Sequence, residues 1–165
     1  MRDAKPEDSD PKDTGPNVIT HPPFLYAGGL FVASLLERLY PLLKLNTNLH
    51  YYIGGAMIAV AVVLAFSCFS RFVKAGTHAP TSKPSTAIVT TGLYRFSRNP
   101  IYLALTLLYL GIIVMDSNIW GVLALVPVLY LMTTGVIQRE ETYLEEKFGQ
   151  DYLEYKASVR RWFTL

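Results

Sequence analysis

Two long stretches of this sequence carry almost no charge. Between residues 51 and 72 the single charged residue is Arg71, and between residues 101 and 138 it is Asp116. A helix needs about 20 consecutive apolar residues to cross the hydrocarbon core of a bilayer. The chain of 165 residues is 51% hydrophobic and 17% charged, so we predict an all-α integral membrane protein with a single domain.

The apolar residues divide into four predicted membrane helices, at residues 23–43, 52–72, 100–115 and 119–137. Pro100 suits the first turn of the third helix, where its missing N–H would have no partner within the helix. Only residues 116–118 separate the last two helices, which predicts an antiparallel hairpin. In the first two helices, Gly28-Gly29 and Gly54-Gly55 are small enough to let a neighbouring helix approach closely.

The first 21 residues are rich in Asp, Lys, Pro and Gly and have almost no large apolar side chains. Such a segment buries too little surface to offset the entropy lost on ordering. We therefore expect residues 1–21 to be a disordered tail in front of a domain formed by residues 22–165.

Several classes of function are disfavoured by composition and spacing. The single cysteine, Cys68, excludes an intrachain disulfide and a cysteine-rich metal site. A net charge of +2 is too small to indicate nucleic-acid binding. His78 has no companion ligands for zinc, and neither a P-loop nor a Rossmann fingerprint is present. We therefore expect no metal and no nucleic-acid partner.

Basic residues are concentrated in the loop at 74–99 and in the C-terminal segment at 138–165, whereas Lys44 alone follows the first helix. By the positive-inside rule, these two segments and both termini are cytoplasmic, in the inner or plasma membrane if the protein is bacterial. Glu37 and Arg38, late in the first helix, have two interpretations. They are charges near the interface, or they belong to a polar cavity.

The segment at residues 90–102 is the most polar and turn-rich part of the second half of the chain. Gly92 lets the backbone turn or approach a ligand closely. Arg95 and Arg98 are three residues apart, so on a helical turn they share a face and could grip one anion together. On these residues alone, arginines that bind lipid phosphate are an equal alternative.

The C-terminal segment begins with Glu140 and Glu141, close to where the fourth helix should leave the membrane. Taken alone, this pair favours the solvated start of a surface helix. Four later apolar residues stand at helical spacing: Tyr152, Tyr155, Val159 and Trp162. They predict an amphipathic helix that lies in the interface or covers the loop.

Taken together, two blocks of residues resemble the integral-membrane methyltransferases, the superfamily of isoprenylcysteine carboxyl methyltransferases and phospholipid N-methyltransferases. The first block is Thr91-Gly92-Leu93-Tyr94-Arg95 followed by Arg98-Asn99-Pro100-Ile101-Tyr102; the second is Glu140-Glu141-x-x-Leu144, Phe148-Gly149, Tyr152, Tyr155 and Val159-x-Arg161. The resemblance covers about half of the chain. It implies S-adenosylmethionine as methyl donor, bound between the cytoplasmic loop and the C-terminal segment, and a lipophilic acceptor that enters from the bilayer.

The resemblance also implies roles for individual residues. The expected donor-binding residues are His78, Thr91, Gly92, Tyr94, Arg98, Asn99, Pro100, Tyr102, Glu140 and Glu141. Arg98, or Arg95, would pair with the donor carboxylate, and Glu140 or Glu141 with its ammonium or ribose. Aromatic side chains would contact the adenine or the sulfonium. Arg98 and Glu141 are the predicted catalytic residues.

The acceptor stays open between a carboxylate, a phospholipid amine and a small lipophilic molecule. A carboxylate is already a nucleophile, whereas an amine must lose a proton, to a glutamate or to His78. Isoprenylcysteine enzymes usually have His where this chain has Asn99, and phospholipid-type members often have Asn. Four membrane helices are fewer than in several members, so a second copy of the chain is a candidate partner that completes the acceptor tunnel.

A competing hypothesis is a non-catalytic membrane protein, for lipid binding or assembly, that retains the same fold. The two hypotheses differ in one structural expectation. A methyltransferase needs Arg98 and Glu141 to face a donor-sized pocket, whereas side chains that point apart into water would contradict catalysis.

Overall fold

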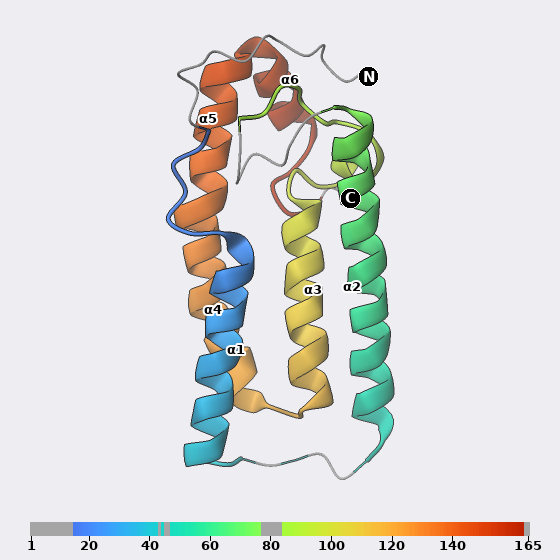
Figure 1. The fold of residues 1–165 in the computed structure, drawn as a ribbon, viewed down its shortest axis with the longest axis vertical. Coiled ribbons are helices and arrows are strands. Elements are labelled where there is room, and N and C mark those ends of the chain that lie inside the picture. The colour runs from blue at the N-terminus through green and yellow to red at the C-terminus, as the bar shows by residue number, and fades with distance from the viewer. Residues whose placement is uncertain (1–14, 43, 45–46, 77–83, 164–165) are drawn as a thin grey trace.

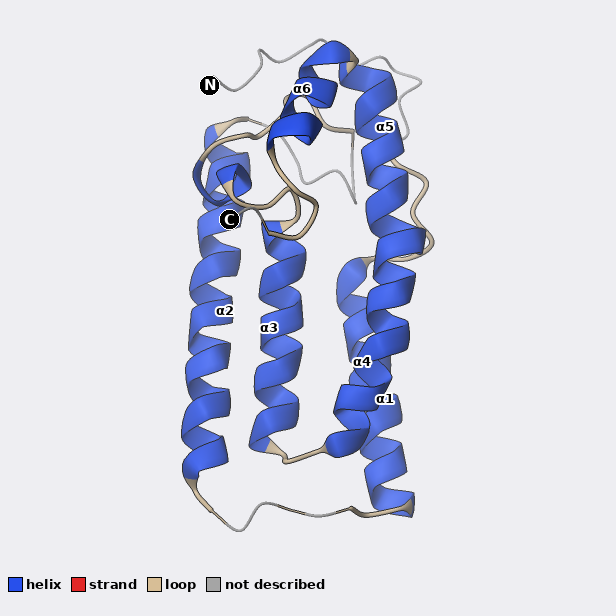
Figure 2. Cartoon of the chain, turned by 180° about the vertical axis from the view of Figure 1, so that it is seen from behind, coloured by secondary structure: helices blue, strands red, loops and turns tan. Residues whose placement is uncertain are grey.

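The structure, a computed structural model, describes residues 15–42, 44, 47–76 and 84–163. Its elements in chain order are α1 (Pro22–Leu39), α2 (Leu49–Lys74), the 3-10 helix η1 (Gly92–Arg95), α3 (Pro100–Met115), α4 (Ile119–Met132), the π-helix η2 (Thr133–Ile137), α5 (Gln138–Phe148) and α6 (Gln150–Ser158). Throughout the described ranges the chain is helix or loop, without a strand (Figure 2). The predicted all-α class is confirmed.

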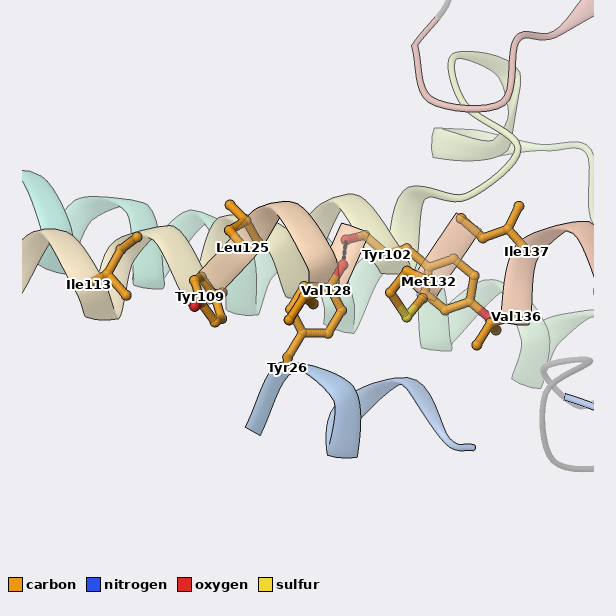
Figure 3. Close-up of a cluster of buried hydrophobic side chains, with 9 residues drawn as sticks. All are labelled: Tyr26, Tyr102, Tyr109, Ile113, Leu125, Val128, Met132, Val136 and Ile137. Atoms are coloured by element: carbon orange, nitrogen blue, oxygen red, sulfur yellow. Dashed lines mark hydrogen bonds between the residues drawn. The ribbon is translucent and has the colours of Figure 1, made fainter. Parts of the chain in front are cut away.

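The long helices run side by side as an elongated bundle made of two helix pairs (Figure 1). α2 packs against α3, and α1 packs against α4. A core of nine buried side chains joins α1, α3, α4 and η2, and Figure 3 shows it: Tyr26, Tyr102, Tyr109, Ile113, Leu125, Val128, Met132, Val136 and Ile137. The hydroxyl of Tyr109 donates to the carbonyl oxygen of Gly121 at 2.9 Å, so this buried polar group is satisfied.

The outer surface of the bundle is unusually apolar. Phe31 on α1, Phe66 on α2 and Val126 on α4 are 71%, 75% and 69% exposed. Large apolar side chains are unfavourable in contact with water and favourable in contact with lipid. By length and composition, α2 and the continuous helix from residue 119 to 148 are sufficient to cross a membrane, and α3 is a shorter apolar helix.

The ends of the helices differ from the expected ones where local chemistry intervenes. α1 ends at Leu39 rather than at residue 43, because Tyr40 precedes a proline and is disfavoured in helical geometry. The fourth helix continues through η2 into α5 as far as Phe148, because residues 138–148 are helix formers without a breaker. Gly149, with a φ of 53°, ends it.

Residues 15–21 are held against the bundle, which differs from the expected disordered tail; residues 1–14 lie outside the described part. The amide of Ile19 donates to the carbonyl oxygen of Gly135 at 3.1 Å. Arg139 Nη1 donates to the carbonyl oxygen of Asn17 at 2.7 Å. The Ile19 side chain covers Gly135, where any side chain on the helix would collide with it. This strap (residues 15–21) leads directly into α1.

α2 and α3 approach most closely at two glycines. A Cβ on Gly54 would lie 2.6 Å from the carbonyl oxygen of Gly111, and a Cβ on Gly111 would lie 2.9 Å from that of Gly54. Around Gly55, by contrast, there is open space within 4 Å. One glycine of the predicted pair therefore makes the helix contact, and its neighbour does not.

This asymmetry predicts different consequences for two adjacent substitutions. Gly54→Ala should separate α2 from α3 and lower the free energy of unfolding by about 1–3 kcal/mol, as overpacking does. Gly55→Ala should be neutral or slightly stabilising, because alanine is the better helix former. Thermal unfolding in detergent measures both variants, and equal behaviour of the two would contradict the close crossing.

Candidate functional site

The loop before α3 and the C-terminal segment are joined by hydrogen bonds at one end of the bundle. The amide of Arg98 donates to the carbonyl oxygen of Arg160 at 3.1 Å. The side-chain amide of Asn99 donates to the carbonyl oxygen of Arg161 at 2.9 Å, and the hydroxyl of Tyr155 donates to the carbonyl oxygen of Tyr94 at 2.8 Å. Segments about 60 residues apart in sequence thus form one unit.

α6 covers this unit with apolar side chains. Tyr152, Tyr155 and Val159 are buried together with Ile88 of the loop. Burial raises the pKa of the Tyr152 and Tyr155 hydroxyls, which stay protonated at neutral pH. α6 ends at Ser158, so Val159 and Trp162, expected on the same helix, lie beyond it.

Beneath α6 lies a cavity of about 390 Å³, a size typical of small-molecule sites. Its polar lining includes six side chains from the loop, α3 and α5: Tyr94, Arg98, Asn99, Tyr102, Glu140 and Glu141. Its remaining wall is largely apolar and includes Phe69 and Phe72 of α2 and Leu105 of α3. The cavity therefore combines a polar end with an apolar one.

Glu141 is the centre of a buried charge cluster at the polar end. Arg161 grips its carboxylate with two bonds, from Nε to Oε1 at 3.0 Å and from Nη2 to Oε2 at 2.8 Å. Arg98 Nη2 lies 3.3 Å from Oε1 of the same carboxylate. The hydrogen bond to Glu141 raises the pKa of the Arg161 guanidinium above its already high value.

The guanidinium of Arg98 is only partly used by this cluster. Its side chain is 8% exposed, and it lines the cavity. Among the described residues, Arg98 Nε and Nη1 have no hydrogen-bond partner. Burial of a cation whose donors lack partners costs free energy when no ligand is bound, and hydrogen bonds to an anion would offset that cost.

Glu140 and Tyr102 connect α5 to α3 beside the charge cluster. The Tyr102 hydroxyl donates to Glu140 Oε1 at 2.6 Å. Both side chains are buried, and both line the cavity. The short bond is of the charge-assisted kind and holds the carboxylate at the cavity wall.

The other residues expected at a donor site divide between three places. Tyr94 lines the cavity and packs edge-on against Phe72, with ring centroids 5.5 Å apart. Pro100 is buried at the start of α3, outside the cavity lining. Thr91 and Gly92 line a second hollow. The prediction for His78 falls outside the described residues.

The expected joint grip of Arg95 and Arg98 on one anion is wrong. The helical turn η1 ends at Arg95 and does not continue to Arg98. Arg95 is exposed and lines the second hollow, whereas Arg98 turns into the cavity. Three-residue spacing brings side chains together only if the helix spans both positions.

Two features of the site were missed at the level of sequence. Arg161, to which no role was assigned, lies beyond α6 and binds Glu141. Its place in the second sequence block was the available signal. His21, Pro22 and Pro23 also line the cavity; of these, His21 belongs to the segment expected to be a disordered tail.

Removal of the Arg161 side chain should loosen the C-terminal segment. Arg161→Gln leaves the buried Glu141 carboxylate with Arg98 alone and should cost about 1–3 kcal/mol in the free energy of unfolding. Amide hydrogen exchange at residues 150–161 should become faster. Arg160→Gln, at an exposed side chain whose backbone carbonyl still binds Arg98, is the control. Equal effects of the two variants would contradict the role of the Glu141 pair.

Comparison with known proteins adds an independent observation. Residues 49–151 match the model of a family described as phospholipid methyltransferase. An uncharacterized protein of Haemophilus influenzae is 40% identical over 62 residues, which are 38% of this chain and 98% of that protein.

Two relatives have named activities. Protein-S-isoprenylcysteine O-methyltransferase of Saccharomyces cerevisiae is 34% identical over 108 residues, which are 65% of this chain and 43% of the yeast protein. Protein-S-isoprenylcysteine O-methyltransferase A of Arabidopsis thaliana is 29% identical over 107 residues, which are 65% of this chain and 52% of the plant protein. The chain thus aligns with about half the length of these two relatives.

Proposed function

The chain belongs to the phospholipid methyltransferase family, and we propose that it transfers a methyl group from S-adenosylmethionine to a lipophilic acceptor. The observation that carries this proposal is the buried guanidinium of Arg98, which lines the cavity with two unused donor nitrogens. The named relatives, both methyltransferases, support the reaction type.

The donor molecule suits the polar end of the cavity. Its α-carboxylate can accept a charge-assisted hydrogen bond from Arg98 Nε or Nη1, the guanidinium nitrogens that have no partner among the described residues. Glu141 is already bound by Arg161 and Arg98, so its role is to position Arg98 rather than to bind the donor ammonium. Glu140 is the carboxylate we assign to the ammonium or the ribose.

The acceptor suits the apolar end. Phe69 of α2 lines the cavity and is 56% exposed on the outer surface of the bundle, so the cavity borders the apolar exterior. Methyl transfer is an in-line displacement, for which the protein must align the two reactants and exclude water. A carboxylate acceptor needs no base there. For an amine acceptor, we assign the proton to Glu140, a buried carboxylate in the cavity lining.

We place the protein in the membrane with four spanning helices and both termini cytoplasmic. The loop before α3, α5 and α6 lie at one end of the bundle, and the α3–α4 turn lies at the other (Figure 1). The first end carries Arg98, Arg139, Lys147, Arg160 and Arg161, as the positive-inside rule requires of a cytoplasmic face. A second copy of the chain is the partner that we propose to complete the acceptor site.

Binding of S-adenosylhomocysteine to the detergent-purified protein tests the donor site. Calorimetry should show micromolar affinity, and Arg98→Gln should weaken it by about 1.5–3 kcal/mol, the value of lost hydrogen bonds to a charged group. Arg95→Gln removes the same charge from the neighbouring exposed arginine and should leave the affinity unchanged. A folded preparation that does not bind would favour the non-catalytic, lipid-binding alternative.

Transfer itself is measured with S-adenosylmethionine that carries a radioactive methyl group. The purified protein is supplied with a lipid extract of the source membranes, and label should enter the fraction soluble in organic solvent. Alkali then releases methanol from methyl esters but leaves N-methyl groups intact, which distinguishes carboxylate from amine acceptors. Incorporation no greater than that of Arg98→Gln would contradict the proposed reaction.

A further inference from the structure

A second hollow lies outside the donor cavity, where α2, η1 and the end of α6 meet. Its lining includes Arg71 from α2, Thr91 and Gly92 at the start of η1, Arg95 at its end, and Ser158 of α6. Of the described residues, Tyr155 alone lines both the hollow and the cavity. Methyl transfer as proposed above does not use it.

The hollow is positively charged and uncompensated. Arg71 and Arg95 both line it, and none of the described residues in its lining is a carboxylate. Within the described part of the chain, neither arginine has an ion pair like those of Arg98 and Arg161. Two guanidinium groups at one concave surface, without acids, attract an anion.

The backbone at Gly92 is shaped around one of these arginines. Gly92 has a φ of 65°, and a Cβ there would lie 2.7 Å from Arg71 Nε and 3.1 Å from its Cζ. The guanidinium of Arg71 therefore packs directly on the glycine backbone. Arg71 is exposed, and this approach places its guanidinium against the loop backbone at the wall of the hollow.

The place of Arg71 on α2 suggests the source of the anion. Arg71 lies in the last turn of a helix long and apolar enough to cross a membrane. Val60 and Leu64, 11 and 7 residues earlier, fall on the same face of α2, and Val60 is 51% exposed. An acyl chain along this face would place its headgroup beside Arg71.

We propose that this hollow binds a phosphate group, supplied by the headgroup of an anionic phospholipid at the cytoplasmic surface. Guanidinium groups match phosphate oxygens with two parallel N–H donors. The hydroxyl of Thr91 supplies a further donor at the same surface. The lipid would hold α2 and the loop at a constant depth in the membrane.

Native mass spectrometry of the full chain in detergent tests this site with phosphatidylglycerol and, for comparison, phosphatidylcholine. Phosphatidylglycerol should bind more tightly. Arg71→Gln and Arg95→Gln should each lower its affinity about fivefold, the typical effect of one basic residue at a membrane surface. Lys74→Gln removes a charge one helical turn further along α2, outside the hollow, and should change the affinity little.

Gly92→Ala and glycerol 3-phosphate complete the experiment. Gly92→Ala should weaken lipid binding as Arg71→Gln does, because it displaces the Arg71 guanidinium without removing charge. Arginine-dependent binding of glycerol 3-phosphate, measured by calorimetry, would support the phosphate site and assign it to a soluble ligand instead of a lipid. Equal losses in Arg71→Gln and Lys74→Gln would overturn the proposal, since they would indicate diffuse surface charge. So would unchanged affinity in every variant, at equal helical content.

Discussion

The arrangement of the site depends on one buried carboxylate, that of Glu141. A carboxylate removed from water must be paired, and Glu141 finds its partners in two other segments, Arg98 before α3 and Arg161 after α6. This requirement brings the loop and the C-terminal segment to the same point on α5. Once the two segments are close, the Arg98 amide can donate a hydrogen bond to the Arg160 carbonyl, and the Asn99 side chain can donate one to the Arg161 carbonyl.

The functional character of the site comes from the unequal use of two arginines. Arg161 binds Glu141 through two nitrogens, whereas Arg98 contacts it through Nη2 alone. Arg98 Nε and Nη1 have no partner among the described residues. Arg161 thus anchors the carboxylate, and the carboxylate in turn orients Arg98 toward the cavity. Because the rest of that cavity is mostly apolar, a ligand with a charged end and a second, lipophilic reactant can meet there.

Sequence alone was sufficient where a signal acts locally. Pro100 and the uncharged run that follows it predicted α3 with the bounds that the structure has. The presence of α1, α2 and α4 followed from the same apolar runs, and the family resemblance from the order of two blocks. Which glycine of Gly54-Gly55 touches α3 could not be predicted, because α2 is apolar on all sides and its pattern does not reveal the packed face.

Sequence was insufficient where a position depends on contacts between distant segments. The strap is ordered by contacts with Gly135 and Arg139, more than 100 residues away. Its polar composition alone therefore wrongly indicated disorder for residues 15–21. The separation of Arg95 from Arg98 depends on where η1 stops. Arg161 could be assigned to Glu141 only once the course of the chain beyond α6 was known.

The central claim is that Arg98 is oriented to receive a ligand carboxylate. A structure of the protein with S-adenosylhomocysteine tests it most directly. We predict that the amino-acid carboxylate of the ligand lies within hydrogen-bonding distance of Arg98 Nε or Nη1, with the Glu141–Arg161 pair intact. A ligand bound elsewhere, or a carboxylate held by other residues while Arg98 contacts only Glu141, would contradict the claim.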